Sequence, residues 1–490
     1  MSDARERDPD FYSHLRSELS DGWRWVDRAI VLAYGALAGL VVVAFTFLSY
    51  VAFDFYLGLH KTAPAWLMLL WTPLVAASIV WVTRRFVPMA AGSGIPQVVA
   101  ALDPALDDKG RRHFVSLKLT VAKVLLSSAG LLGGLSVGRE GPSVQVAAGV
   151  MLHSQRWLRG RRNALNPHTL LVAGGAAGIA AAFNAPLAGV VFAIEELSRR
   201  MEARYSGVII AAIVLAGLMG VSAFGSAAYF GAVTVPALSL SHLVPALLVA
   251  GVCGLVGGLF SRLLIVSLTG QSNDRLSVLR RQKPVRFAAL MGLLVAIVGL
   301  VTGGMTAGSG TEAARDLLHA SEPGQAASLL GVLKLVTTWL SAWSGVPGGL
   351  FAPSLSIGAG FGYNVSMLTG GQIDAALVAM GMAGFLAAVT QAPLTAFIIV
   401  MEMIDGRPMV LSLMAVAMVS ATISRMISRP LYETLAMRML AGYTASQATR
   451  AADAAASDAA LAAPAAPSPA PATPAPAPTS PQTPPSPPPS

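Results

Sequence analysis

Asn184-Ala-Pro-Leu-Ala-Gly-Val-Val-Phe-Ala-Ile-Glu195 occurs a second time in this chain as Gln391-Ala-Pro-Leu-Thr-Ala-Phe-Ile-Ile-Val-Met-Glu402. Both copies place Ala-Pro-Leu before an apolar run and end on a glutamate at the same register. A Gly/Ala-rich run precedes each copy, at 174–182 and 381–388. The match predicts a chain of two homologous halves, which is typical of membrane proteins whose site lies at the interface between repeats.

Composition places the chain in a bilayer. Of its 490 residues 54% are hydrophobic and 12% are charged, which is about half the charge of a soluble domain. The uncharged run from Ala29 to Phe53 is long enough to span ~30 Å of hydrocarbon. Further apolar runs lie at 64–83, 124–138, 168–194, 206–241, 243–261, 287–311, 335–367, 375–401 and 408–424. Their uneven lengths and internal Gly and Pro predict an all-α polytopic protein with interrupted helices.

Several classes of chemistry are not encoded. The single cysteine, Cys253, excludes an intrachain disulfide and a cysteine-based metal site. The chain has no HExxH and no GxxxxGK[ST], so neither a zinc protease nor a P-loop motor is indicated. An intramembrane enzyme would need a catalytic pair within the spans, such as two aspartates or a Ser/Lys couple, and we find none.

The net charge of +9 is explained by topology better than by nucleic-acid binding. Lys and Arg concentrate in cytoplasmic loops of membrane proteins. The densest basic cluster lies between two apolar runs and consists of Arg275, Arg280, Arg281, Lys283 and Arg286. We therefore expect this loop to be cytoplasmic, and we expect no nucleic-acid partner.

Two terminal segments flank the predicted membrane domain, residues 29–444. Residues 1–28 are polar, with Trp23 and Trp25 next to the first apolar run, which predicts an interfacial segment and not a cleaved signal peptide. The last 30 residues hold 13 of the 31 prolines. Residues 445–490 are therefore expected to form a disordered tail, either passive or used for partner docking.

Three glycine-rich turns share one design. They are Gly92-Ser93-Gly94-Ile95-Pro96, Gly138-Arg139-Glu140-Gly141-Pro142 and Gly348-Gly349-Leu350-Phe351-Ala352-Pro353. Each ends in a proline suited to the first turn of a helix. A helix N-terminus offers free N–H groups and partial positive charge, and glycine allows an anion to approach them closely. The alternative is that these residues merely break helices for packing. Three such turns together favour an anion site without a fixed charge.

These motifs resemble those of the CLC family of chloride channels and chloride/proton exchangers, whose signatures read GSGIP, GREGP and GxFxP. The family's Asn-Ala-Pro-Leu-Ala segment matches at 174–196, and its late Pro-Leu-Tyr matches Pro430-Leu431-Tyr432. The resemblance covers roughly 29–444 and implies a fold of two inverted repeats. It also implies a multi-pass protein of the bacterial inner membrane, working as a homodimer with both termini cytoplasmic. The paired CBS domains that many members carry are not expected here.

The resemblance assigns roles to individual residues. Ser93 and Tyr432 would offer hydroxyls to a central chloride, and the N–H groups of Leu350 and Phe351 would complete that site. Arg139 and Gly141 join the chloride-binding residues. Without the motifs, Ser93 would be interpreted as a turn residue and Tyr432 as a membrane-interface tyrosine.

Glu140 matches the family's gating glutamate. Ionised, its carboxylate would occupy an anion position; protonated, it would swing away and admit chloride. Glu196 matches the internal proton glutamate of exchangers, with Met403 as its repeat counterpart, while Glu195 and Glu402 resemble paired structural acids. The alternatives are structural roles: Glu140 would cap a helix and pair with Arg139, and Glu196 would cap a helix.

The resemblance favours chloride/proton exchange over a passive voltage-gated channel, and both over a fluoride exporter. Chloride and protons would be the transported ions, with no cofactor. Lys123, a lone lysine in an apolar run, is expected to form a structural ion pair.

Overall fold

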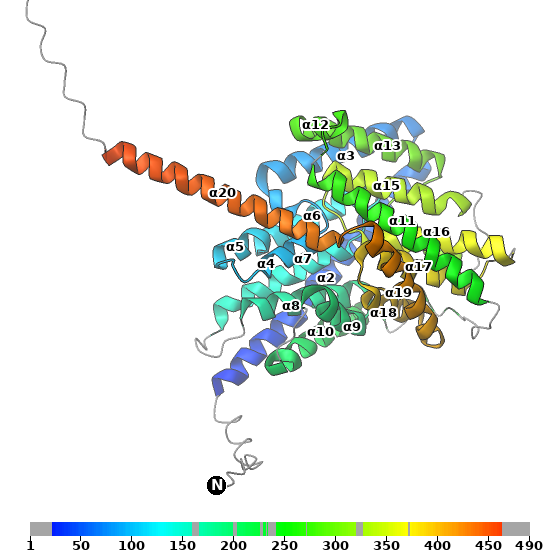
Figure 1. The fold of residues 1–490 in the computed structure, drawn as a ribbon, viewed down its shortest axis with the longest axis horizontal. Helices are drawn as coiled ribbons and strands as arrows, with labels where there is room; N and C mark the ends of the chain where they lie inside the picture. The colour runs from blue at the N-terminus through cyan, green and yellow to red at the C-terminus, as the bar shows by residue number, and fades with distance from the viewer. Residues whose placement is uncertain are drawn as a thin grey trace, which may run out of the picture. The chain divides into compact units, whose positions relative to one another are not determined.

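The computed structural model describes residues 22–158, 166–198, 203–225, 229–231, 233, 242–270, 272–319, 327–370 and 373–462. Within these residues the regular structure is helical (Figure 1). The α-helices are α2 (Gly22–Thr62), α3 (Ala65–Phe86), α4 (Ile95–Ala101), α5 (Asp108–Phe114), α6 (Leu117–Leu132), α7 (Glu140–His153), α8 (Pro167–Phe183), α9 (Pro186–Phe192), α10 (Ala203–Phe224), α11 (Leu243–Thr269), α12 (Arg275–Gln282), α13 (Pro284–Val301), α14 (Thr311–Leu318), α15 (Leu330–Ser344), α16 (Phe351–Gly370), α17 (Ala375–Thr390), α18 (Pro393–Ile404), α19 (Val410–Ile427) and α20 (Leu431–Ala462).

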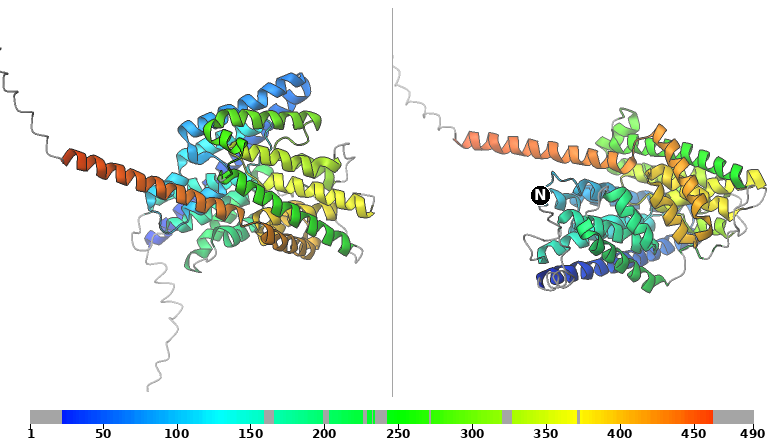
Figure 2. Two further views of the ribbon diagram at one scale, coloured as in Figure 1. Left: turned by 45° about the horizontal axis from the view of Figure 1, so that its top comes forward. Right: turned by 60° about the horizontal axis from the view of Figure 1, so that its bottom comes forward.

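Helix lengths are uneven, as the apolar runs predicted. Among the described residues, seven helices are long and apolar enough to cross a membrane. Others, such as Pro167–Phe183 and Pro393–Ile404, are apolar but shorter. Figure 2 shows that the helices are tilted and do not form a parallel bundle. Such interrupted helices are tolerated at membrane depth where protein or a polar cavity surrounds their ends.

The two sequence repeats have the same backbone break. Asn184 and Gln391 both adopt left-handed backbone angles, with φ of 55° and 60°. Pro186 and Pro393 then open α9 and α18. A left-handed residue ends a helix and a proline at its first position starts the next one. The runs 168–194 and 375–401 are therefore each divided into two helices, and the predicted repeat is confirmed in the backbone.

Small residues let paired helices approach closely in both halves. In the first half, a side chain on Gly174 of α8 would lie 2.7 Å from the Cα of Ala148 in α7. In the second half, a side chain on Gly381 of α17 would collide with the Gly358 carbonyl of α16. Helices in lipid associate through close backbone packing of this kind.

The paired glutamates join the two repeats. The Glu195 carboxylate accepts hydrogen bonds from the N–H groups of Leu394 (3.1 Å) and Thr395 (2.7 Å), at the start of α18. The Glu402 carboxylate accepts hydrogen bonds from Leu187 (3.2 Å) and Ala188 (2.7 Å), at the start of α9. Each repeat thus caps a helix of the other, which confirms the structural role predicted for these two acids.

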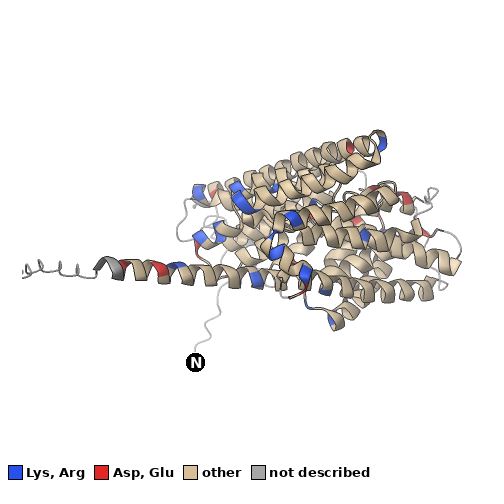
Figure 3. Ribbon diagram, turned by 90° about the horizontal axis from the view of Figure 1, so that it is seen from above, with Lys and Arg blue, Asp and Glu red and all other residues tan. Residues whose placement is uncertain are grey.

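Charges lie mostly at helix ends and turns, and long stretches of helix carry none (Figure 3). Large apolar side chains such as Leu70, Leu74 and Val51 are exposed along these stretches. Exposed apolar surface of this extent is what lipid covers. Three residues of the basic cluster, Arg275, Arg280 and Arg281, lie in the short helix α12, and the other two lie just after it. Asp274 caps α12 by accepting a hydrogen bond from the Ser277 N–H (3.0 Å).

Two predicted boundaries differ from the structure. α2 already begins at Gly22, so residues 22–28 continue the first long helix and are not a separate segment. α20 continues to Ala462, so residues 445–462 are helical where the sequence favoured disorder. The alanine-rich composition of this stretch explains the difference, because alanine has the highest helix propensity. The predicted interfacial residues 1–21 and the proline-rich residues 463–490 lie outside the described residues. The described residues divide into two units, one ending at Leu440 and the other beginning at Ala441.

Candidate functional site

The three glycine-rich turns meet in space. The N–H of Gly138 donates to the Gly349 carbonyl (2.8 Å), and the N–H of Gly349 donates to the Gly138 carbonyl (2.6 Å). The N–H of Gly348 donates to the Gly92 carbonyl (3.2 Å). Helices α4, α7 and α16 therefore begin close to one point, as the design of the turns predicted.

Glycine is required at this junction. Gly94 has φ of 106°, and a side chain there would lie 2.7 Å from the Gly141 carbonyl oxygen. A side chain on Gly141 would collide with the Ser93 hydroxyl. The turns thus contact one another through bare backbone, which leaves N–H groups accessible to a small ion.

Two buried hydroxyls lie at the junction. Ser93 is 7% exposed and Tyr432 is 1% exposed. The two side chains are close enough to interact. Neither hydroxyl, however, has a described hydrogen-bond partner of ordinary geometry. The Tyr432 ring stacks on that of Phe351, with centroids 6.1 Å apart and planes at 11°. Buried hydroxyls that lack protein partners are suited to bind a ligand that accepts hydrogen bonds.

Glu140 is the first residue of α7 and is fully buried. Neither of its carboxylate oxygens has a described partner that satisfies hydrogen-bond geometry. Burial opposes the negative charge of this carboxylate, and the Arg139 guanidinium and the backbone N–H groups of Glu140 itself and Ala352 offset only part of that cost. A carboxylate in this position can occupy a place that a bound anion would otherwise take.

Arg139 is held by two phenols. One terminal nitrogen of its guanidinium donates to the hydroxyls of Tyr50 and Tyr229, at 2.9 Å each. The guanidinium carbon also lies 4.3 Å from the centre of the Tyr50 ring. These contacts orient the guanidinium beside Glu140 and combine hydrogen bonding with cation–π attraction.

Lys123 holds the Gly92–Pro96 turn through hydrogen bonds to its backbone. Its buried ammonium donates to the carbonyls of Ala90 (2.7 Å) and Gly92 (2.8 Å). The predicted ion pair was wrong, because carbonyl oxygens at the end of a broken helix satisfy the charge in place of a carboxylate. Lys334 of α15 does the same in the second half, with bonds to the Thr306 (2.9 Å), Ala307 (3.2 Å) and Gly308 (2.7 Å) carbonyls.

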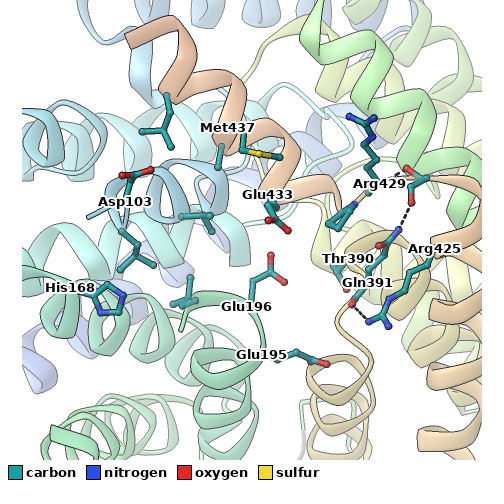
Figure 4. Close-up of a pocket in the computed structure, with 17 residues that line it drawn as sticks. Asp103, His168, Glu195, Glu196, Thr390, Gln391, Arg425, Arg429, Glu433 and Met437 are labelled. Carbon is teal, nitrogen blue, oxygen red and sulfur yellow. Dashed lines mark hydrogen bonds between the residues drawn. The ribbon is translucent and has the colours of Figure 1, made fainter. Parts of the chain in front are cut away.

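Glu196 lies in a π-helical turn, Ala193–Leu197, that directly follows α9. Such turns are frequent at functional sites because the extra residue changes the direction of side chains. Glu196 lines a cavity of about 860 Å³, which we call the Glu196 pocket. Figure 4 shows Glu196 and Glu433 pointing toward one another across it. Asp103, His168, Arg425 and Arg429 also line this pocket (Figure 4).

A second cavity of about 510 Å³ is lined by Arg139, and we call it the Arg139 pocket. Tyr432 lies within electrostatic reach of both Glu196 and Glu140. Polar groups therefore link the two pockets in the order Glu196, Tyr432 with Ser93, Glu140 and Arg139. This arrangement defines the protein as a membrane transporter with a buried polar site between two cavities.

Comparison with known proteins identifies the family. Residues 74–425 match the family model described as "Voltage gated chloride channel". The chain is 30% identical over 431 residues to the H(+)/Cl(-) exchange transporter ClcA of Vibrio vulnificus strain YJ016, covering 83% of this chain and 88% of the relative. It is 31% identical over 443 residues to ClcA of Klebsiella pneumoniae subsp. pneumoniae, covering 86% and 90%. The chain belongs to the CLC family.

Solved structures show the same fold. A slow cyanobacterial Cl−/H+ antiporter superposes with a TM-score of 0.72 at 24% identity, covering 85% of this chain and 98% of the antiporter. A CLC-type fluoride/proton antiporter superposes with a TM-score of 0.66 at 21% identity, covering 87% and 99%. The predicted fold of two inverted repeats with tilted, broken helices is confirmed.

Sequence reasoning missed four polar residues around this site: Tyr50, Tyr229, Lys334 and Glu433. Lys334 could have been found from its spacing in the repeat. It stands 15 residues before Gly349, as Lys123 stands 15 residues before Gly138. Glu433 directly follows Tyr432. Tyr50 and Tyr229 had no local signal, because only the fold brings them to Arg139.

Proposed function

We propose that this protein exchanges chloride for protons across a bacterial inner membrane. The observation that carries the proposal is the buried Glu140 carboxylate beside the unpartnered hydroxyls of Ser93 and Tyr432. Hydroxyl and amide donors coordinate a halide without a fixed charge that would prevent its release. Family relatives named H(+)/Cl(-) exchange transporters support exchange.

The chloride site consists of the Ser93 and Tyr432 hydroxyls with the N–H groups of Leu350 and Phe351, and the Arg139–Gly141 turn forms its other wall. Glu140 competes with the anion when ionised and leaves the site when protonated. Glu196 delivers the proton from its pocket, since Tyr432 lies within electrostatic reach of both glutamates. The chain contributes the donors and acceptors, and it needs no cofactor.

The test is to load vesicles containing the purified protein with chloride and to follow pH in a low-chloride medium. Chloride efflux should drive proton uptake. Glu140→Gln should keep chloride flux, but its rate of proton uptake should fall at least tenfold. Its chloride flux should no longer depend on pH. Glu196→Gln should keep chloride flux and lose proton uptake.

Asp405→Asn serves as the matched control, because Asp405 is an exposed carboxylate on the loop after α18. Its proton uptake should remain within twofold of the unmodified protein. Chloride efflux without proton uptake in the unmodified protein would establish the passive channel instead. Full pH dependence in Glu140→Gln would remove Glu140 as the gate.

The transported anion needs its own measurement, because chloride and fluoride antiporters share this fold. The Ser93 hydroxyl supports chloride by resemblance to chloride-selective members. Flux with chloride as the sole anion should exceed flux with fluoride at least tenfold. The reverse order would establish a fluoride exporter.

The assembly and orientation that we propose are a homodimer with both termini and the Glu196 pocket on the cytoplasmic side. The basic residues Arg84 and Arg280, which lie near one another, support this orientation. Labelling of a cysteine introduced at exposed Arg281 in right-side-out vesicles tests it. Reaction with an impermeant reagent in intact vesicles would reverse the orientation.

A further inference from the structure

A third cavity lies where α6 begins and α7 ends. Arg112, Ser116, Leu117, His153 and Arg156 are among the residues that line it, and we call it the Arg156 pocket. Its volume is about 140 Å³. Pockets that enclose a small organic molecule have volumes of roughly 300–1,000 Å³. The Arg156 pocket therefore suits one small group, such as a single phosphate, and is too small for a nucleotide.

Basic side chains gather at this pocket without an acid. Arg112 lies on α5, and Arg156 lies on the 3-10 turn that follows α7. Both arginines are exposed, and both are within electrostatic reach of the His153 ring. Among the described residues, none that lines the pocket is acidic, and neither arginine has an ion-pair partner. Like charges held together in this way favour binding of an anion.

Neutral donors complete the lining. Ser116 directly precedes α6, and its side chain makes no capping hydrogen bond to that helix. The His153 ring is held by stacking on Tyr34, with ring centroids 6.2 Å apart and planes at 26°. Two guanidinium groups with a hydroxyl and an imidazole form the kind of donor set that binds phosphate oxygens. The chemistry of the lining therefore agrees with the size of the cavity.

An apolar stripe on α6 begins at the same pocket. Leu117, Val121 and Leu125 are all exposed, and their spacing of four residues places them on one face of the helix. Leu117 also lines the pocket. Trp157, directly after Arg156, is exposed, as tryptophans at the membrane–water boundary often are. A ligand with both a phosphate and an acyl chain would match the pocket and the stripe together, whereas free phosphate would use only the pocket.

The direction of α6 places the pocket on one side of the membrane. Near the end of α6, the Leu132 carbonyl accepts a hydrogen bond from the Trp71 indole (2.9 Å), close to the start of α3. Lys123, further back along α6, reaches Ala90, just after the end of α3. The two helices therefore run in opposite directions, and the start of α6 lies on the side where α3 ends at Arg84. That side is the one we propose to be cytoplasmic, where the membrane surface is negatively charged.

We propose that the Arg156 pocket binds the phosphate of an anionic phospholipid of the cytoplasmic leaflet, with one acyl chain lying along Leu117, Val121 and Leu125. Arg112 and Arg156 attract the charge, while Ser116 and His153 donate hydrogen bonds to phosphate oxygens. The pocket lies at the opposite end of α7 from Glu140, about 20 Å away along the helix. Lipid binding there is independent of the proposed function and can be measured without transport.

Thermal unfolding of the purified full chain in detergent, titrated with lipid, tests the proposal. Phosphatidylglycerol should raise the unfolding temperature in a saturable way, because a ligand of the folded state stabilises it. Phosphatidylcholine with the same acyl chains and inorganic phosphate should each need at least tenfold higher concentrations for the same effect. An equal effect of phosphatidylcholine would overturn recognition of an anionic lipid. An equal effect of inorganic phosphate would establish a site for free phosphate instead.

The double variant Arg112→Gln/Arg156→Gln should raise the half-saturating concentration of phosphatidylglycerol at least fivefold. Arg275→Gln/Arg286→Gln is the matched control, because it removes the same charge from exposed positions outside the pocket. Its value should stay within a factor of 1.5 of that of the unmodified protein. An unchanged value for the pocket variant would overturn the site. An equal loss in both double variants would show general attraction to positive charge and would also overturn it.

Val121→Ser tests the acyl-chain path. It should raise the half-saturating concentration of phosphatidylglycerol at least twofold and leave that of inorganic phosphate unchanged. Val332→Ser, at an equally apolar exposed position on α15, is the control and should leave both values unchanged. An unchanged value for Val121→Ser would overturn the choice of a lipid over free phosphate.

Cryo-electron microscopy of the unmodified chain in phosphatidylglycerol nanodiscs needs no variant and therefore does not depend on how any substitution folds. Density for a phosphate between Arg112 and Arg156 is expected, continuous with density for a chain along α6. An empty pocket would overturn the proposal. The substituted side chains are exposed, so each variant without lipid should unfold at the temperature of the unmodified protein.

Discussion

Lys123 and Lys334 show how two single residues can occupy equivalent positions and support different turns. Each Nζ is buried and donates hydrogen bonds to backbone carbonyls. Lys123 holds the turn that presents Ser93, whereas Lys334 holds the turn in the Arg139 pocket. The same substitution at the two positions therefore separates the two turns functionally.

Lys123→Met should lower chloride affinity at the central site at least fivefold, because the Gly92 carbonyl loses the donor that fixes the turn. Lys334→Met should leave central affinity within twofold. Each variant leaves carbonyls unpaired and should lower the free energy of unfolding by about 2 kcal/mol. Calorimetric titration of chloride and thermal unfolding in detergent measure both effects. Equal loss of central affinity in the two variants would contradict this assignment.

Among single residues, the sequence predicted those that stand in recognisable glycine- and proline-containing turns. Ser93, Glu140 and Phe351 stand in turns whose Gly and Pro residues are visible without a structure. Lys123 was predicted with the wrong partner, because the carbonyls that bind it come from a turn 31 residues away. Tyr229 reaches Arg139 from 90 residues away, and nothing local indicates it.

Among the helices, α9 and α18 are joined by the exchanged caps of Glu195 and Glu402. The four hydrogen bonds pair a carboxylate with N–H groups at a helix start, where the dipole adds to the attraction. Glu195 also lines the Glu196 pocket. The caps therefore stabilise the contact between the repeats beside the predicted proton path.

Glu402→Gln should lower the free energy of unfolding by about 1–2 kcal/mol, because an amide has one acceptor oxygen for two N–H donors. Glu195→Gln should cost a similar amount and also reduce proton uptake, because it displaces the turn that carries Glu196. Thermal unfolding and the vesicle assay measure the two effects. The exposed Asp453→Asn in α20 is the stability control. An unchanged unfolding temperature for Glu402→Gln would show that the caps contribute nothing.

The sequence predicted the helix interruptions and the repeat but not these caps. Proline and glycine signal a break from within a single segment. The π-helical turn at Ala193–Leu197 has no such signal, because its counterpart in the second repeat continues as α18 to Ile404 with a similar apolar sequence. We infer that packing between the repeats, and not local sequence, makes this turn π-helical in the first repeat and α-helical in the second.

For the molecule as a whole, we place the interface of the proposed dimer on α19. Leu411, Met418, Val419 and Met426 are exposed and recur at helical spacing, so they form one apolar stripe. The proposed dimer would bury such a stripe. The purified protein in detergent should then have a protein mass of twice the 50.5 kDa of one chain, measured by light scattering.

Met418→Arg should shift the protein to monomers, because an unpaired guanidinium would be placed in the interface. Leu74→Arg, on exposed α3, introduces the same charge on a different surface, and it should remain dimeric. Both carry the cost of about 2.5–3.5 kcal/mol for arginine in the membrane. A dimeric Met418→Arg would place the interface on another face.

The antiparallel bond pair between Gly138 and Gly349 has a consequence for how access to the site alternates. These glycines belong to different repeats; Gly138 stands two residues before Glu140, and Gly349 directly precedes Leu350. A transporter that rocks one half against the other would have to break this link, at bond lengths of 2.6 and 2.8 Å, in every cycle. Such a link favours a mechanism in which the two halves stay fixed and only the Glu140 side chain moves. The path to the site would then open and close over the length of one glutamate side chain.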